Sequence, residues 1–255
     1  MINAHTLKTV FLFTTCLLIP HIASAGQQDN LGNTAQYVEL NTASDQPFSA
    51  YIAGPQDASQ AIVLIHGWWG LDDEVKSWAN EYAVAGYRVM AIDLYNHQVT
   101  HNPATAKQLM QSVNQSDADE KYAAAIRALS VPGRKIAIMG RSFGASQALH
   151  AAQVAKDKVA ATIVYYPYGE LMTDRKMLTD IKAPILGHFA REDFFLKPDQ
   201  VNAFASVLKK AGLHMTVNMY NARHGFDKTG SSNFNEPAHK MAQEKTRQFL
   251  DRYLN

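Results

Sequence analysis

The sequence is nearly free of cysteine. Its 255 residues include one, Cys16, which lies in a short apolar run near the N-terminus. A mature chain without that run contains no thiol, so disulfide bonds, thiolate metal sites and a cysteine nucleophile are all excluded. A protein without cysteine suits an oxidising compartment, where thiols are readily oxidised.

The sequence also lacks an excess of charge of either sign. Lys plus Arg number 24 and Asp plus Glu number 23, and Lys8 alone of these lies among the first 25 residues. The mature chain is therefore almost neutral. Binding of nucleic acid requires a concentrated basic face, so nucleic acid is not an expected partner. No internal repeat, low-complexity tract or Pro/Gly/Ser-rich linker divides the chain.

The apolar run near the N-terminus is too short to cross a bilayer. It covers residues 10–19 (VFLFTTCLLI), whereas a membrane helix needs about 20. Lys8 precedes it and Ala23-Ser24-Ala25 follows, the order of a secretory signal peptide cleaved after Ala25. We expect residues 1–25 to be removed, leaving residues 26–255 as one periplasmic or secreted domain without stable membrane insertion. The alternatives are a retained membrane anchor and, less favoured because Cys16 lies inside the run, a lipoprotein.

Beyond residue 35, short apolar runs alternate with helical patterns. AIVLIHG, RVMAIDLY, KIAIMG and ATIVYYP are almost continuously apolar, as expected of parallel strands covered on both faces. Such an alternation predicts an α/β fold with a mostly parallel central sheet, helices on both faces and no large cap domain. Strands are predicted at 36–40, 48–53, 61–66, 88–94, 135–140, 160–166, 184–190 and 214–220, the first two as an antiparallel edge. Helices are predicted at 72–85, 103–113, 118–129, 142–155, 199–211 and 237–253.

One serine stands at an abrupt change from strand to helix. Gly140-Arg141-Ser142-Phe143-Gly144 is a G-x-S-x-G motif, entered by a buried strand and followed by an alanine-rich helix. That setting is typical of the nucleophile elbow of α/β-hydrolases, in which the serine is held exposed on a strained turn. Ser142 is therefore the candidate nucleophile. The alternative is a serine that only caps the helix.

A serine hydroxyl needs a base, and the base needs a carboxylate to orient it. Both should follow later strands, because ligands bind at the carboxyl ends of parallel strands. Asp193 follows the strand in PILGHFAREDFF, and His224 follows the strand in TVNMYNARHGFD. The order Ser142, Asp193, His224 is the order that the elbow fold imposes. Glu192 is the competing carboxylate, one residue away.

The negative oxygen of a tetrahedral intermediate needs hydrogen-bond donors. The N–H of Phe143 follows the nucleophile directly, and HGWWG places the N–H of Trp68 just after a strand. We expect His66 in that loop to be hydrogen-bonded within the turn rather than catalytic. His97 and His101 form H-x-x-x-H, but Pro103 and the polar run around them disfavour a helix. We therefore expect no metal and no cofactor.

Five segments together resemble the dienelactone hydrolase family of the α/β-hydrolase superfamily. They are HGWWGLDD, RVMAIDLY running into NHQ, GRSFGA, REDFFLKP and YNARHGFD, and the likeness extends from about residue 37 to the end of the chain. The resemblance implies an α/β-hydrolase fold, a triad of Ser142, Asp193 and His224, and an oxyanion hole at the Trp68 and Phe143 amides. It also implies action on a carboxylic ester or lactone.

The chain departs from the best-known members at three places. Those members use cysteine where Ser142 stands, so the chain resembles a serine-nucleophile member. They carry glutamate where Gly67 stands. Their two substrate-binding arginines match His97 and Lys228, so the resemblance implies that these two bind substrate. Lysine lacks the bidentate fork of arginine.

Many aromatic residues fall on the predicted carboxyl-end loops. They suggest an apolar pocket for an acyl or aryl group, with Trp69 and Tyr95 among its substrate-binding residues. We expect at least half of the set to belong to the core. The set is Trp68, Trp69, Tyr95, Tyr168, Phe194, Phe195 and Phe226.

The sequence therefore predicts an exported serine hydrolase that cleaves small-molecule carboxylic esters or lactones. A peptidase or an acyltransferase using the same three residues is the alternative, and a non-catalytic binding protein on this fold is less favoured. A dehalogenase is disfavoured, because its elbow needs a carboxylate where Ser142 stands.

Overall fold

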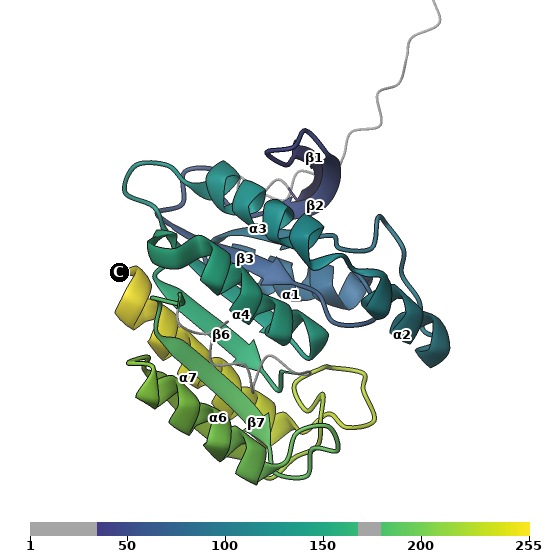
Figure 1. Ribbon diagram of the computed structural model, residues 1–255, viewed down its shortest axis with the longest axis vertical. Coiled ribbons are helices and arrows are strands. Elements are labelled where there is room, and N and C mark those ends of the chain that lie inside the picture. The colour runs from purple at the N-terminus through teal and green to yellow at the C-terminus, as the bar shows by residue number, and fades with distance from the viewer. Residues whose placement is uncertain (1–34, 168–179) are drawn as a thin grey trace, which may run out of the picture.

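The computed structural model describes residues 35–167 and 180–255 (Figure 1). The predicted signal peptide and Tyr168 lie outside the described residues. Within the described residues, eight strands form one sheet in the order β1-β2-β4-β3-β5-β6-β7-β8. They are β1 (Gln36–Asn41), β2 (Pro47–Ala53), β3 (Gln60–Ile65), β4 (Arg88–Ile92), β5 (Lys135–Arg141), β6 (Ala161–Tyr165), β7 (Ile185–Ala190) and β8 (Met215–Tyr220).

The pairing of the strands matches the pattern read from the sequence. β1 pairs antiparallel with β2, and β2 pairs antiparallel with β4. The other neighbours, from β4 through β3 to β8, are all parallel. β3 and β5 to β7 are buried over nearly their whole length, because helices cover both faces of this part of the sheet. The predicted antiparallel edge and mostly parallel sheet are confirmed.

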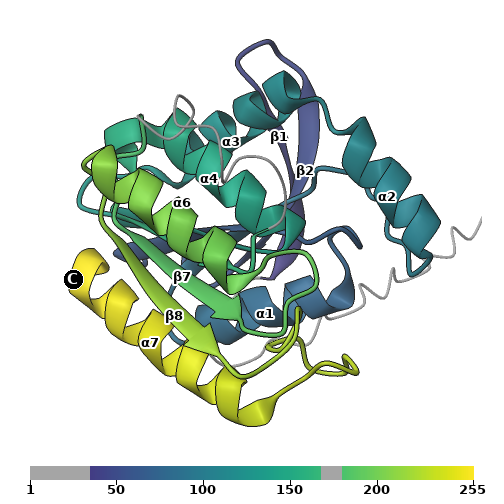
Figure 2. The ribbon, with the colours of Figure 1, turned by 60° about the horizontal axis from the view of Figure 1, so that its bottom comes forward.

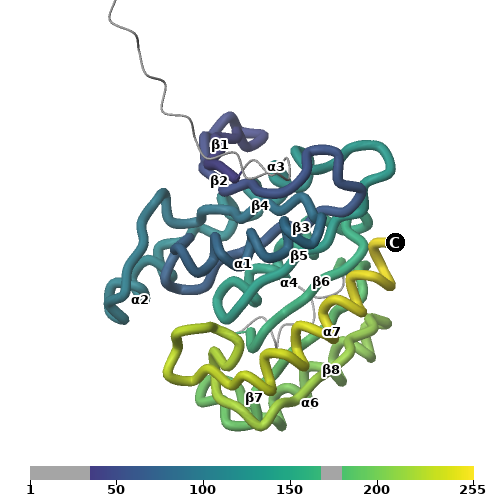
Figure 3. Tube along the Cα trace, turned by 180° about the vertical axis from the view of Figure 1, so that it is seen from behind, coloured from purple at the N-terminus to yellow at the C-terminus, as the bar shows by residue number. Residues whose placement is uncertain are grey.

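Alternate side chains of each strand face different helices. On β3, Ile62 and Leu64 belong to the apolar layer that also contains residues of α1 and α7, whereas Val63 and Ile65 belong to the layer that contains residues of α3, α4 and α6. Figure 1 shows α3, α4 and α6 in front of the sheet, and Figure 3 shows α1 and α7 from behind. Figure 2 shows α6 and α7 on opposite sides of β7 and β8. The α-helices of the described part of the chain are α1 (Asp73–Val84), α2 (Pro103–Ser112), α3 (Gln115–Leu129), α4 (Phe143–Ala155), α6 (Pro198–Lys210) and α7 (Glu236–Leu254).

α3 begins three residues before its predicted start at residue 118. The side chain of Asn114 accepts hydrogen bonds from the N–H groups of Ser116 (2.9 Å) and Asp117 (3.3 Å). A capping asparagine satisfies first-turn N–H groups, so the polar stretch that reads as a break is the start of the helix. Within residues 35–167 and 180–255, no helix is long and apolar enough to cross a membrane.

The carboxyl ends of the parallel strands meet at one edge of the sheet. β3 leads into His66, and β5 ends at Arg141, next to Ser142. Asp193 follows β7 by three residues, and His224 follows β8 by four. The topology therefore brings the candidate catalytic residues from separate parts of the chain to one place.

Candidate active site

Ser142 occupies a strained turn between β5 and α4. Its φ of 53° and ψ of −120° lie in a region that residues other than glycine rarely adopt. A Cβ at Gly140 would overlap the carbonyl of Gly144, and a Cβ at Gly144 would overlap the carbonyls that end β3. Both glycines are therefore required by close backbone approach. The Ser142 side chain makes no capping hydrogen bond to α4. The structure therefore does not have the alternative, a serine that only caps the helix.

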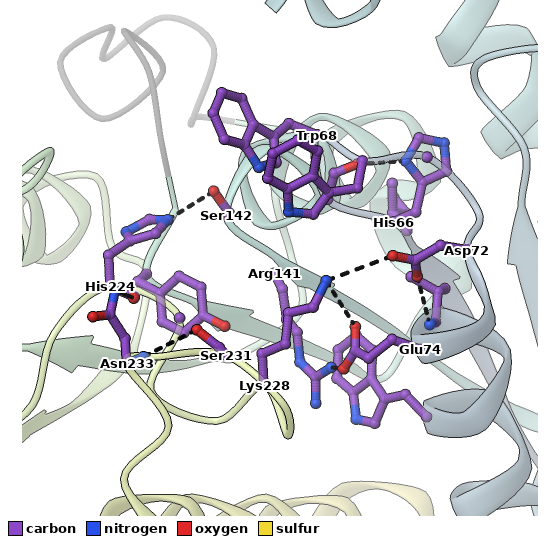
Figure 4. Close-up of a pocket in the computed structure, with 18 of the residues that line it drawn as sticks. His66, Trp68, Asp72, Glu74, Arg141, Ser142, His224, Lys228, Ser231 and Asn233 are labelled. Atoms are coloured by element: carbon purple, nitrogen blue, oxygen red, sulfur yellow. Dashed lines mark hydrogen bonds and ion pairs between the residues drawn. The ribbon is translucent and has the colours of Figure 1, made fainter. Parts of the chain in front are cut away.

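Ser142, His224 and Asp193 form a continuous hydrogen-bonded chain. Ser142 Oγ lies 2.8 Å from His224 Nε2 (Figure 4). His224 Nδ1 lies 2.8 Å from Asp193 Oδ2. The other carboxylate oxygen of Asp193, Oδ1, accepts the N–H groups of Phe195 (2.8 Å) and Leu196 (3.3 Å). Asp193 is 1% exposed, so these bonds fix its orientation. The arrangement can hold the proton of the imidazole on Nδ1 and leave Nε2 free to accept the serine proton.

The competing carboxylate, Glu192, points away from the histidine. Its Oε2 lies 3.5 Å from Arg223 Nε, and about two thirds of each side chain is exposed. In the turn after β7, the carboxylate of Asp193 and not that of Glu192 contacts His224 Nδ1. The structure therefore selects Asp193.

Three residues contact His224, and the sequence did not single out two of them, Tyr166 and Asn233. The Tyr166 ring packs 4.6 Å from the imidazole, measured between centroids, and the Phe195 ring packs 5.0 Å from it. Asn233 Nδ2 donates a hydrogen bond to the His224 carbonyl at 3.0 Å. Tyr166 reads in the sequence as one more apolar strand residue and Asn233 as a loop amide, so neither carried a signal.

His66 holds the loop after β3 in place through two hydrogen bonds. Its Nδ1–H donates to the Gly67 carbonyl at 2.7 Å, and its Nε2 accepts the N–H of Leu94 at 3.1 Å. Burial lowers the pKa of His66, which keeps the imidazole neutral and able to accept that bond. The expected structural role of His66 is confirmed.

The two predicted oxyanion-hole residues lie on the elements that adjoin Ser142. Phe143 is the first residue of α4, where N–H groups have no carbonyl partner within the helix. Trp68 lies in the loop that follows β3 and lines the same cavity as Ser142. Phe143 therefore directly follows Ser142 in the chain, and Trp68 shares the cavity with it, while the oxyanion hole at their two amides stays a prediction.

A cavity of about 270 Å³, here called the catalytic pocket, opens over Ser142 and His224 (Figure 4). The rings of Trp68 and Trp69 pack against each other at 4.5 Å on its wall. Its apolar lining suits the hydrocarbon part of a ligand. That lining consists of Ile65, Trp68, Trp69, Val75, Trp78 and Phe195.

Beneath the serine turn lies a buried ionic cluster that the sequence did not reveal. Arg141 Nε lies 2.7 Å from Asp227 Oδ2, and its Nη1 lies 2.5 Å from Glu74 Oε1. The guanidinium also stacks 3.6 Å above the Trp78 ring. Burial alone would lower the pKa of Arg141, but the two carboxylates raise it above its ordinary value. Arg141 is therefore permanently charged. Its partners come from segments far apart in the chain, so no local pattern predicts the cluster.

Two of the expected substrate-binding residues lie outside the catalytic pocket, and the structure corrects both expectations. Tyr95 is 3% exposed, and its ring stacks in the core 6.1 Å from that of Phe143. His97 is largely exposed and lies 3.8 Å from Asp93 and 4.0 Å from Glu39. The Asp93 carboxylate accepts the N–H groups of Tyr95 and His97. These bonds close a left-handed turn after β4. The turn directs the side chain of Tyr95 into the core and that of His97 to solvent.

The other two expected substrate-binding residues do line the pocket. Trp69 contributes to its wall. Lys228 reaches it too, but its ammonium lies between Asp72 (3.5 Å) and Glu74 (3.7 Å) and is not a free cation. Of the remaining aromatic residues, Phe226 is in the core, whereas Phe194 is 82% exposed.

The profile of one protein family covers most of the chain. It is the dienelactone hydrolase family, and the match extends over residues 48–254. The chain belongs to the dienelactone hydrolase family. The resemblance read from the five sequence segments is thereby confirmed.

Individual relatives agree with this membership. Carboxymethylenebutenolidase 1 of Cupriavidus pinatubonensis is 22% identical over 232 residues, covering 84% of this chain and 95% of that protein. Protein usf of Aquifex pyrophilus is 26% identical over 180 residues, covering 67% and 77%. A dienelactone hydrolase-like promiscuous phosphotriesterase from metagenomic libraries superposes with a TM-score of 0.74 at 17% identity, covering 87% and 99%. This last likeness supports the α/β-hydrolase fold.

Proposed function

We propose that the protein hydrolyses small-molecule carboxylic esters or lactones through an acyl-enzyme on Ser142. The class of reaction follows from membership of the dienelactone hydrolase family. The observation that carries the serine mechanism is the unbroken chain from Ser142 Oγ through His224 to Asp193, with 2.8 Å at each step. A hydroxyl so placed can lose its proton to the imidazole as it attacks.

Acylation begins when Ser142 Oγ attacks the substrate carbonyl and His224 Nε2 takes its proton. The carbonyl oxygen becomes negative and receives hydrogen bonds from the N–H groups of Phe143 and Trp68. Each such donor is worth about 3 kcal/mol in the transition state. Asp193 stabilises the imidazolium. The carbon–oxygen bond then breaks, and His224 returns the proton to the departing alcohol, or to the ring-opened hydroxyl of a lactone.

Deacylation repeats these steps with water as the nucleophile. His224 Nε2 accepts a proton from water, which adds to the acyl carbon. The same two amides hold the negative oxygen. Collapse of this second intermediate releases the carboxylic acid, and the proton on His224 returns to Ser142 Oγ. Every proton is handled by the residues of this chain.

A panel of short esters and lactones on the purified mature chain tests the proposal. We expect Ser142→Ala to lower kcat on the best substrate by about four to six orders of magnitude, because the nucleophile is removed. Amide substrates and acceptor alcohols in the same panel separate hydrolysis of esters from peptidase and acyltransferase activity. Hydrolysis that continues at the wild-type rate in Ser142→Ala would remove the proposal.

We also infer that the protein acts outside the cytoplasm. Residues 1–25 carry the order of charge, apolar run and small-residue cleavage site typical of an export signal. The absence of cysteine beyond Cys16 suits an oxidising compartment. The working enzyme is then residues 26–255, in the periplasm or outside the cell.

A further inference from the structure

Lys228 stands between the catalytic pocket and a second, larger cavity. The second cavity measures about 710 Å³, against about 270 Å³ for the catalytic pocket, and is here called the outer cavity. Five residues line both, so the two cavities share one wall. The shared residues are Trp69, Asp72, Glu74, Lys228 and Ser231.

The wall is closed by an ionic contact that spans two segments. Lys228, on the loop that carries His224, places its Nζ 3.5 Å from Asp72 Oδ2 and 3.7 Å from Glu74 Oε2 (Figure 4). We call this contact the Lys228 bridge. Both carboxylates belong to the start of α1 and have second anchors. Asp72 Oδ1 accepts the N–H of Val75 at 3.0 Å, and Glu74 Oε1 pairs with Arg141. The lysine is therefore the one member of the bridge that is not otherwise fixed by these contacts.

The Lys228 bridge and His224 lie on different sides of Ser142. Figure 4 shows His224 on one side of Ser142 and the Lys228 bridge on the other. His224 must deliver its proton to the departing alcohol, so the alcohol part of an ester lies on the His224 side. The acyl part then points toward Lys228, and its far end meets the shared wall.

We propose that Lys228 is a specificity-determining residue that closes the acyl end of the catalytic pocket and restricts the enzyme to esters of short, uncharged acids. This inference rests on the proposed function and specifies its substrate class. The outer cavity holds space for a longer chain, but the Lys228 bridge lies in the way. A longer acyl group must displace a partly buried ammonium from two carboxylates, whereas a short one leaves the contact intact.

The charges at the wall also disfavour an anionic acyl group. A terminal carboxylate would meet Asp72 and Glu74 with one ammonium already held between them. Like charges brought together in a partly buried site repel each other strongly. An acyl chain that ends in a carboxylate is therefore rejected by the same wall that limits length.

The test varies acyl length while the leaving group stays constant. p-Nitrophenyl acetate, butyrate and octanoate are compared by the ratio of kcat/KM for octanoate to that for acetate, so that a general loss of activity cancels. We expect this ratio to be low in the wild type and to rise about tenfold or more in Lys228→Ala and in Lys228→Thr. Lys228→Arg, which keeps length and charge, should keep the ratio low.

Lys240→Ala is the matched control. Lys240 forms a similar Lys–Glu pair with Glu236 on α7, away from both cavities, so its loss should not change the ratio. A wild type that cleaves octanoate as well as acetate, or a ratio unchanged in both shortened variants, overturns the inference and leaves the proposed function standing. Absence of Ser142-dependent hydrolysis of every ester removes the proposed function itself.

Discussion

Arg141 and Asp227 form a buried ion pair, 2.7 Å apart, directly beside the serine turn. Their exposed fractions are 8% and 2%, so neither charge is solvated if the other is lost. We expect Asp227→Asn to lower the free energy of unfolding by about 3 kcal/mol, because it leaves a buried charge with one partner fewer. Urea unfolding measures this. Glu244→Gln, which breaks an exposed pair with Arg247, is the control and should leave the midpoint unchanged. Equal midpoints for the two variants would contradict the expected contribution of the buried Arg141–Asp227 pair to the free energy of unfolding.

Asp193 holds the imidazole of His224 through a 2.8 Å hydrogen bond, so under the proposed mechanism its replacement should lower kcat. Asp193→Asn can present its N–H₂ to His224 Nδ1, which favours the wrong tautomer, so we expect kcat to fall by about 10⁴-fold. Glu192→Gln is a control one residue away, since Glu192 faces Arg223 and solvent. Steady-state kinetics on the same ester compares the two. A larger loss in Glu192→Gln than in Asp193→Asn would reverse the assignment.

Buried histidines should make the fold sensitive to mild acid. Burial lowers the pKa of His188 from 6.5 to about 3, and that of His150 to about 4. His188 accepts and donates within the core, 2.8 Å from Tyr220 Oη and 2.9 Å from Thr246 Oγ1. Because the folded pKa values lie below the unfolded value, this stability is complete above pH 6.5 and is lost as the pH falls.

Each such histidine should remove about 1.4 kcal/mol of unfolding free energy per pH unit below its unfolded pKa. Unfolding measured at intervals from neutral pH to about pH 5, above most carboxyl pKa values, isolates this effect. His188→Gln removes one titrating group, so its slope should be shallower, whatever its stability at neutral pH. An identical slope in both proteins would show that His188 does not stay neutral.

The proposed export predicts where the mature chain begins. Protein isolated from cells that express the full sequence should begin at Gly26, and intact-mass measurement determines this to the residue. Replacing Ala23 and Ala25 with bulky residues removes the small-residue site and should prevent cleavage. A mature protein that retains residues 1–25 would contradict the assignment of a cleaved signal.

Three features could be predicted from the sequence because each has a local signal: the positions of the strands, the mostly parallel sheet with an antiparallel edge, and the candidate residues Ser142, Asp193 and His224. The order of the strands within the sheet was not predicted. Strands covered on both faces are continuously apolar, and the elbow motif fixes where a nucleophile, an acid and a base fall relative to strand ends. The structure brings the three side chains into hydrogen-bond contact, as that order requires.

The residues whose position or contacts the sequence did not predict depend on geometry that no local pattern encodes. Tyr95 and His97 follow a strand, as pocket residues do, but the turn closed by Asp93 directs them away. Arg141 has partners on α1 and on the His224 loop, which meet only after the sheet has formed. Lys228 reaches the pocket as the family resemblance implies, yet its ammonium is already held by two carboxylates.

The most direct test of the central claim is covalent labelling of the nucleophile. A fluorophosphonate reacts with an activated serine and adds a fixed mass to the protein, which intact-mass spectrometry detects. We expect one adduct on the wild type, located at Ser142 by peptide mapping, and none on Ser142→Ala. Equal labelling of the two proteins, or an adduct at another residue, would contradict it.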